Sequence, residues 1–233
     1  MKKILLFAVL LSFTVNTTLH AQLKEEPYDL WDVLVGGRIG PSMSTLTNTD
    51  GKAKLWFHGC IFTEVFVNPN FSMTFEAGYS RKGANQVIID PTRIVEEERG
   101  KYLVGPENPY DYNLDYLNTG YLLKYSFNQK LGIYTGINFS TLVSGKAKVK
   151  SSQNIDANNG EVEFVNDIKK ELHGGEFTIP IGVELVFAKN FTLDARWNWS
   201  PRRVAKSDKA RMLLGKARNQ YLSLTIGYKI LVF

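Results

Sequence analysis

The segment FTLDARWNWS, residues 191–200, alternates apolar and polar side chains at every position. Successive side chains of a β-strand point to opposite faces, so this segment predicts a strand with one apolar and one polar face. An apolar face that packs inward belongs to a soluble barrel or sandwich, whereas one that points outward belongs to a barrel in a membrane. The direction of this apolar face therefore decides the class of protein.

The N-terminus has the features of a secretory signal peptide. Lys2 and Lys3 precede the apolar run Ile4–Val15, which is about a dozen residues long. Leu19-His20-Ala21 is an acceptable small-residue cleavage site. A membrane-spanning helix would need roughly 18 apolar residues or more. We predict that residues 1–21 are a signal peptide that is removed from an exported protein.

The rest of the chain predicts neither a membrane-spanning helix nor an internal disulfide. Polar residues interrupt every later apolar run, and Cys60 is the single cysteine. Removal of Lys2 and Lys3 takes the formal charge from +5 to +3, which is too small to indicate a partner of nucleic acid. The remaining length of roughly 210 residues suits one β domain.

Eight segments predict strands, because most are rich in aromatic and β-branched residues and end near Gly or Asn. They are Val33–Ser44, Leu55–Val67, Phe71–Gly83, Tyr112–Phe127, Leu131–Val143, Glu176–Phe187, Phe191–Ser200 and Gln220–Phe233. Three connections are tight turns, at Asn68-Pro69-Asn70, Asn128-Gln129-Lys130 and Ala188-Lys189-Asn190. The others are longer and cover residues 45–54, 84–111, 144–175 and 201–219. Short turns at one rim and long loops at the other are typical of an outer-membrane barrel.

The polar faces of these strands carry small residues and charges of both signs. The charged residues are Arg38, Glu64, Glu76, Lys82, Lys124, Glu184, Asp194 and Arg196. In an eight-stranded membrane barrel these side chains would line a narrow lumen, where they must pair to be stable. On a solvated outer face they would form ordinary surface ion pairs. The near balance of sign and the many Gly and Ser residues favour a packed lumen with no wide channel.

Aromatic residues gather near the strand ends. They are Trp56, Tyr79, Tyr112, Tyr121, Tyr125, Phe127, Phe187, Phe191, Trp197, Trp199, Tyr221 and Tyr228. This distribution is typical of girdles at the two lipid–water interfaces. A soluble lipocalin-like barrel shares the period and strand count, but we would expect fewer bulky aromatics on its inward apolar face.

The pattern therefore predicts an all-β fold. We expect an eight-stranded antiparallel up-and-down transmembrane β-barrel over residues 33–233, preceded by a periplasmic segment at residues 22–32. Its turns would be short on the periplasmic side, and its loops would be long on the extracellular side.

Four stretches resemble the outer-membrane β-barrel family of Gram-negative bacteria that is often called PorT-like, or "porin family". They are Gly36-Gly37-Arg38-Ile39-Gly40, Phe75–Gly83, Leu114–Tyr125 and Ile181–Leu185, and their order covers essentially the whole mature chain. The family commonly carries a proline where this sequence has Gly120. The resemblance implies a monomeric outer-membrane barrel and allows a role in secretion or assembly, but it implies little about activity.

The end of the chain also resembles the C-terminal insertion signal of such barrels, because it stops on the aromatic Phe233. This residue is out of phase with the apolar positions from Leu222 to Val232. Either a bulge near Lys229 shifts the register, or the signal is weaker than it looks.

The sequence offers little chemistry for catalysis or for a cofactor. It has no glycine-rich phosphate loop, and His58, His173 and Cys60 are too few for a metal-ligand cluster in the mature chain. A lipid-modifying enzyme at the outer rim would need a serine or a carboxylate beside His173. Otherwise His173 is an exposed loop residue, and we expect His58 to pack among polar lumen groups. We predict no catalytic residue, metal or cofactor.

The connection 201–219 is strongly basic. Its cations are Arg202, Arg203, Lys206, Lys209, Arg211, Lys216 and Arg218, and its single acid is Asp208. Such cations can contact the phosphates of lipopolysaccharide or an acidic partner. They can also form a solvated loop, or pair with Glu96-Glu97-Glu98 of the connection 84–111 across the barrel mouth.

Taken together, the sequence predicts a non-enzymatic outer-membrane barrel of structural or interaction type. Its extracellular loops would contact lipopolysaccharide or a protein partner. Three alternatives stay open: a small passive porin, which needs a continuous water path, a lipid-modifying enzyme at the rim, and a periplasmic lipocalin-like binder. We expect a monomer that binds no nucleic acid.

Overall fold

The computed structural model describes residues 28–88, 109–128, 130–151, 162–188 and 190–232. Its elements are β1 (Val33–Thr47), β2 (Lys54–Asn68), β3 (Phe71–Lys82), β4 (Tyr110–Ser126), β5 (Leu131–Ser151), β6 (Val162–Asp167), η3 (Lys169–Glu171), β7 (Gly175–Ala188), β8 (Phe191–Arg203), α2 (Asp208–Leu214) and β9 (Arg218–Leu231). The predicted signal peptide lies outside the described residues, and so does Phe233. Neither helix in the described part of the chain has the length and hydropathy of a membrane span.

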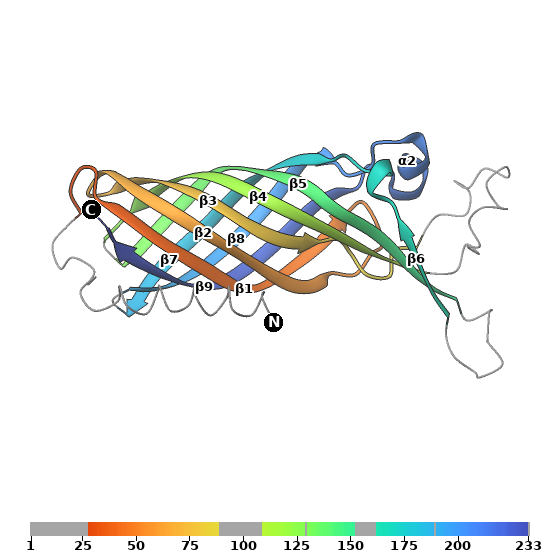
Figure 1. Ribbon diagram of the computed structural model, residues 1–233, viewed down its shortest axis with the longest axis horizontal. Helices are drawn as coiled ribbons and strands as arrows, with labels where there is room; N and C mark the ends of the chain where they lie inside the picture. The colour runs from red at the N-terminus through yellow and green to blue at the C-terminus, as the bar shows by residue number, and fades with distance from the viewer. Residues whose placement is uncertain (1–27, 89–108, 129, 152–161, 189, 233) are drawn as a thin grey trace, which may run out of the picture.

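Eight of the described strands form a closed barrel (Figure 1). β1 pairs with β2 on one side and with β9 on the other, and the β4–β5 pairing completes the ring. Every pairing among the described strands is antiparallel. Most pairs join strands that are consecutive along the chain. The exceptions are the closing β1–β9 pair and the β5–β7 pair, which skips β6. β6 pairs with β5 and extends a hairpin beyond the ring. The predicted eight-stranded up-and-down barrel is confirmed.

The three tight turns lie together at one end of the barrel, which we call the short-turn end. The Asn68 side chain accepts hydrogen bonds from the backbone N–H groups of Asn70 and Phe71, at 2.9 and 2.8 Å. Asn128 accepts in the same way from Lys130 and Leu131, both at 2.8 Å. This use of asparagine to close a turn is the local reason why the strands reverse there. The opposite end, with α2 and β6, is the long-loop end (Figure 1).

The polar residues of the strands point into the barrel and the apolar residues point out. In β8, Asp194, Arg196 and Asn198 are at most 1% exposed, whereas Trp197 is 44% exposed. On β7, Ile181 is 55% exposed. An outer surface formed by large exposed apolar side chains is stable only in contact with lipid. The apolar face of FTLDARWNWS therefore faces the membrane. The lipocalin-like alternative, with its apolar face inside, is therefore wrong.

Two of the twelve aromatic residues predicted for the girdles were assigned wrongly. Tyr112 and Tyr221 are 2% and 3% exposed and lie inside the barrel, in phase with the polar residues of β4 and β9. The other ten are exposed or half-buried, as an interfacial position requires. A position near a strand end does not by itself place an aromatic side chain at the interface, because the phase of the strand decides whether it points outward or into the lumen.

The long connections contain more regular structure than the sequence predicted. β5 continues to Ser151 and forms a hairpin with β6, inside the predicted loop 144–175. β8 continues to Arg203, and α2 follows it inside the predicted loop 201–219. The register of β9 against β1 runs unshifted from Ile226 to Leu231, so the suggested bulge near Lys229 is wrong.

Candidate functional site

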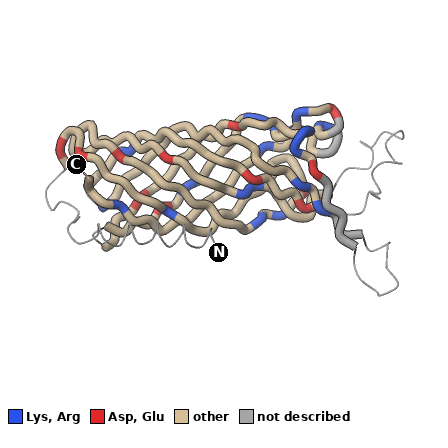
Figure 2. The backbone as a smooth tube through the Cα atoms, viewed as in Figure 1, with Lys and Arg blue, Asp and Glu red and all other residues tan. Residues whose placement is uncertain are grey.

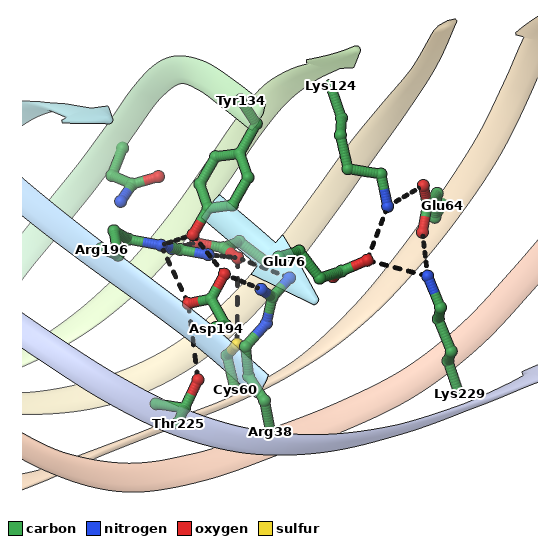
Figure 3. Close-up of polar contacts among 12 residues, drawn as sticks. Arg38, Cys60, Glu64, Glu76, Lys124, Tyr134, Asp194, Arg196, Thr225 and Lys229 are labelled. Atoms are coloured by element: carbon green, nitrogen blue, oxygen red, sulfur yellow. Dashed lines mark hydrogen bonds and ion pairs between the residues drawn. The ribbon is translucent and has the colours of Figure 1, made fainter. Parts of the chain in front are cut away.

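The lumen at the short-turn end holds a ring of four paired charges (Figure 3). Lys124 and Lys229 both bind Glu184, with Nζ–Oε1 distances of 2.8 Å. Both also bind Glu64: Lys124 in a close ion pair with Oε1, and Lys229 at 3.4 Å from Oε2. The Ser72 hydroxyl donates to Glu64 Oε1 at 2.6 Å. The four charges come from β2, β4, β7 and β9, so this inner ring crosses the lumen from wall to wall.

A second cluster lies next along the lumen and is built around Arg196. Its guanidinium makes two parallel contacts with Glu76, at 2.5 and 3.1 Å. Arg38 binds Asp194 at 3.0 Å and Glu76 at 3.5 Å. The Tyr134 hydroxyl donates to Asp194 and accepts from Arg196 Nε at 2.8 Å (Figure 3). Bidentate arginine–carboxylate pairs of this kind combine geometric specificity with charge compensation.

A third pair, Lys82 and Glu176, lies toward the long-loop end. Lys82 Nζ is 2.6 Å from Glu176 Oε1, and it also donates to the Ser140 hydroxyl at 3.2 Å. Asn219 donates to the other carboxylate oxygen of Glu176 at 2.5 Å, and Lys82 lies 4.5 Å from the centre of the Tyr116 ring. The pair is thus enclosed by neutral polar and aromatic groups.

Each of these three clusters contains equal numbers of cations and anions. The ten side chains are at most 6% exposed. Burial of a charge is very costly unless it is paired and hydrogen-bonded, so the pairing is what allows the lumen to be filled with polar residues. All eight charged residues that the sequence placed in the lumen lie in these clusters.

Lys229 and Glu176 also belong to the clusters but were left out of the predicted set. Each shares the polar phase of its strand: Lys229 with Thr225, and Glu176 with Glu184. The alternation of inward and outward positions along each strand would therefore have predicted that Lys229 and Glu176 point into the lumen.

An apolar cluster closes the lumen at the long-loop end. Its members come from strand ends, connecting segments and α2: Leu46, Ala84, Val87, Tyr110, Tyr112, Leu114, Tyr116, Leu142, Ala147, Leu172, Val204, Ala205, Ala210, Leu214 and Ala217. Each is at most 6% exposed. The described parts of the long connections therefore fold inward at their bases and form an apolar plug.

The segment before β1 covers the short-turn end. Tyr28 stacks on Phe66 with ring centroids 4.1 Å apart, and the backbone N–H of Trp31 donates to the carbonyl of Phe66 at 2.9 Å. Burial raises the pKa of Tyr28 to about 12. The pocket between Tyr28, Phe66 and the inner ring has a volume of about 10 Å³, which is space for about one water molecule.

The predicted basic connection lies at the long-loop end, where Lys and Arg residues gather (Figure 2). Arg202 and Arg203 end β8, Lys206 follows, and Arg211 lies in α2; all four are exposed. The side chain of Lys209 lies outside what the structure describes, as does the acidic run Glu96-Glu97-Glu98. The suggested pairing of the two loops across the barrel mouth therefore stays a prediction.

His173 lies beside this basic connection. Arg202 Nη2 is 3.1 Å from His173 Nδ1, and Arg202 Nη1 donates to the carbonyl of Gly175 at 2.9 Å. Partial burial lowers the pKa of His173, and the nearby cations Arg202, Arg211 and Lys206 lower it further. In the described part of the chain, no carboxylate or hydroxyl group is hydrogen-bonded to this imidazole.

Two further features bear on cofactors. His58 is buried in the lumen, 3% exposed, and neither of its ring nitrogens has a hydrogen-bond partner among the described residues. Within the same residues, no group of three or more His, Cys, Asp or Glu side chains is placed to hold a metal ion.

Comparison with known proteins agrees with this architecture. Residues 20–206 match the sequence profile described as "Outer membrane protein beta-barrel domain". The closed barrel, with its polar side chains inside and its apolar side chains outside, defines a β-barrel of the bacterial outer membrane. The chain belongs to the outer membrane protein beta-barrel domain family. The expected outer-membrane location is thereby confirmed, while the narrower PorT-like grouping stays a prediction.

Several solved structures are similar to this chain at low sequence identity. Ail, the attachment invasion locus protein of Yersinia pestis, is 13% identical over 85% of this chain and 99% of its own, with a TM-score of 0.45. OprG of Pseudomonas aeruginosa is 10% identical over 87% and 98%, with a TM-score of 0.43. Neisserial surface protein A is 12% identical over 84% and 96%, with a TM-score of 0.41. No curated protein sequence matches this chain significantly.

Proposed function

We propose that this protein is a non-enzymatic interaction protein of the outer membrane, whose extracellular basic loops contact the acidic groups of lipopolysaccharide or of a protein partner. One observation carries the proposal: the lumen is filled by three neutral charge clusters and an apolar plug, while exposed cations gather on the far side of that plug. The charged groups that can contact a ligand are therefore the exposed cations at the rim, because the charges along the barrel axis are already paired with one another.

The lumen clusters argue against a passive porin. A solute would have to separate the Lys124–Glu184 and Arg196–Glu76 pairs, each of which is buried and bonded more than once. It would then have to cross the apolar plug. Eight-stranded barrels have an interior that side chains can fill completely, and the inward-facing charged side chains of this barrel are buried.

A lipid-modifying enzyme at the rim has less support. The imidazole of His173 is bonded by Arg202, a cation that cannot act as a nucleophile or as the acid that orients a catalytic histidine. The arrangement suits recognition of an anion better than transfer of an acyl group.

The proposal predicts salt-dependent binding of lipopolysaccharide by the purified barrel. We expect detergent-solubilised protein immobilised on a support to retain lipopolysaccharide at low ionic strength and to release most of it at high ionic strength, because exposed charges are screened within about 10 Å at 0.1 M salt. Retention would be measured against a barrel in which Arg202, Arg203, Lys206 and Arg211 are replaced by glutamine.

Two results would count against the proposed contact. One is retention that salt does not weaken, since this would point to acyl chains rather than to charge. The other is an absence of retention in the wild type, combined with no protein partner recovered by cross-linking at the loops of intact cells.

A further inference from the structure

Three cations from successive parts of the chain surround the position of His173, and one of them, Arg202, contacts its imidazole directly. Arg202 is near the end of β8, Lys206 is in the connection after it, and Arg211 is in α2. All three cations act on the imidazole electrostatically. Asp208 is 3.3 Å from Arg211, and the two side chains are 87% and 55% exposed. Such an exposed ion pair is weak and can be displaced by a stronger anion.

The contact with Arg202 leaves one ring nitrogen of His173 free to donate a hydrogen bond to an anion. Because arginine has no acceptor, Nδ1 of His173 must accept the hydrogen bond from Arg202. The neutral ring then carries its proton on Nε2, which can donate to a further group. The second contact of Arg202, with the carbonyl of Gly175, holds the guanidinium in place beside the ring.

The backbone beneath these side chains is firmly held. The N–H of His173 donates to the carbonyl of Val204 at 3.0 Å, and the N–H groups of Lys206 and Ser207 donate to the carbonyl of Glu171 at 3.0 and 3.1 Å. The neighbouring residues Leu172 and Ala205 form a bridge and are buried in the apolar plug. The cations thus stand on an ordered base, which reduces the entropy cost of binding a ligand.

The depth of the cluster in the membrane indicates the source of the anion. Trp197 and Trp199 face outward on β8, and Phe177 does so on β7, in the positions of an interfacial girdle. Arg202 lies three residues beyond Trp199, about 10 Å along the strand. Cations just beyond an aromatic girdle lie at the level of lipid headgroups.

We propose that Arg202, His173, Lys206 and Arg211 form a site for a phosphate monoester of the surrounding lipid, the headgroup phosphate of lipid A. This inference rests on the proposed function and names the chemical group and the residues of the contact. The guanidinium groups bind the phosphate oxygens, Lys206 adds charge, and His173 donates from Nε2.

The test is a binding titration of the full-length protein in detergent micelles with diphosphoryl, monophosphoryl and dephosphorylated lipid A and with inorganic phosphate. The variant R202Q/R211Q removes two cations of the site. The matched control K52Q/K146Q removes two exposed cations of the same rim outside it. Heat-modifiable gel mobility verifies that each variant is folded.

We expect R202Q/R211Q to bind diphosphoryl lipid A about a hundredfold more weakly, because it removes two charge-assisted hydrogen bonds and each accounts for roughly one order of magnitude. The control should stay within about twofold, as expected for surface charges at a distance. H173L should also weaken binding, and H173Q, which keeps a side-chain N–H donor, should restore part of it.

Three outcomes would overturn the site. An equal loss in the control would show a diffuse charge effect, in which case the proposed function stands and this site does not. Competition by inorganic phosphate as strong as by diphosphoryl lipid A would assign the site to free phosphate instead. If the wild type binds no form of lipid A but captures an acidic protein, the lipid assignment fails while the interaction function stands.

Discussion

Replacement of Glu76 by glutamine is expected to lower the free energy of unfolding of the barrel by about 3–5 kcal/mol. The carboxylate accepts two bonds from Arg196 and also neutralises Arg38, and both arginines are buried in the lumen. The amide keeps the shape of the side chain but leaves one positive charge uncompensated. Urea-induced unfolding in detergent or vesicles, followed by heat-modifiable gel mobility, measures the change.

A matched control exists at the rim. Asp115 binds Arg81 in an ion pair whose side chains are 15% and 28% exposed, so solvent screens it more. D115N is expected to cost at most about 1 kcal/mol. Equal effects of E76Q and D115N would contradict the description of the lumen as a set of obligatory buried pairs.

Replacement of Ile61 by arginine is expected to destabilise the inserted barrel by about 2–4 kcal/mol. Ile61 lies in the middle of β2, faces outward and is 70% exposed. Exposure to water would make this substitution almost neutral, whereas exposure to the bilayer centre requires desolvation of the guanidinium. The measurement is the urea midpoint of the barrel refolded into lipid vesicles.

Leu55 provides the control for depth. It is 69% exposed on the same face of the same strand, but it lies at the long-loop end of β2. L55R is expected to cost no more than about 1 kcal/mol, because charges near the interface can reach water. If the two substitutions had the same small effect, the apolar face would not be in contact with lipid.

The barrel itself could be predicted from sequence because two local signals agree. Strict alternation, as in Phe191–Ser200, fixes which residues share a face, and asparagine at Asn68 and Asn128 fixes where strands reverse. Both depend on residues close together in the chain. The balance of charge on the polar face then indicated a packed lumen, since unpaired charges would not be stable there.

The sequence could not predict which charges pair or how the lumen is closed. Arg196 and Glu76 are 120 residues apart, and their contact depends on the stagger of strands around the ring. The apolar plug is likewise assembled from positions far apart, such as Leu46 and Leu172, which look like ordinary loop residues when taken singly. The contact between Arg202 and His173 joins two connections and has no signature in either.

The most direct test of the account is the conductance of the purified wild-type barrel in a planar lipid bilayer. Insertion would be established independently by heat-modifiable mobility and by protection of the strands from protease in vesicles. A lumen filled by paired charges and closed by an apolar plug predicts no sustained single-channel steps from the inserted protein. Reproducible steps that scale with the amount inserted would contradict the closed lumen, and with it the assignment of function to the rim.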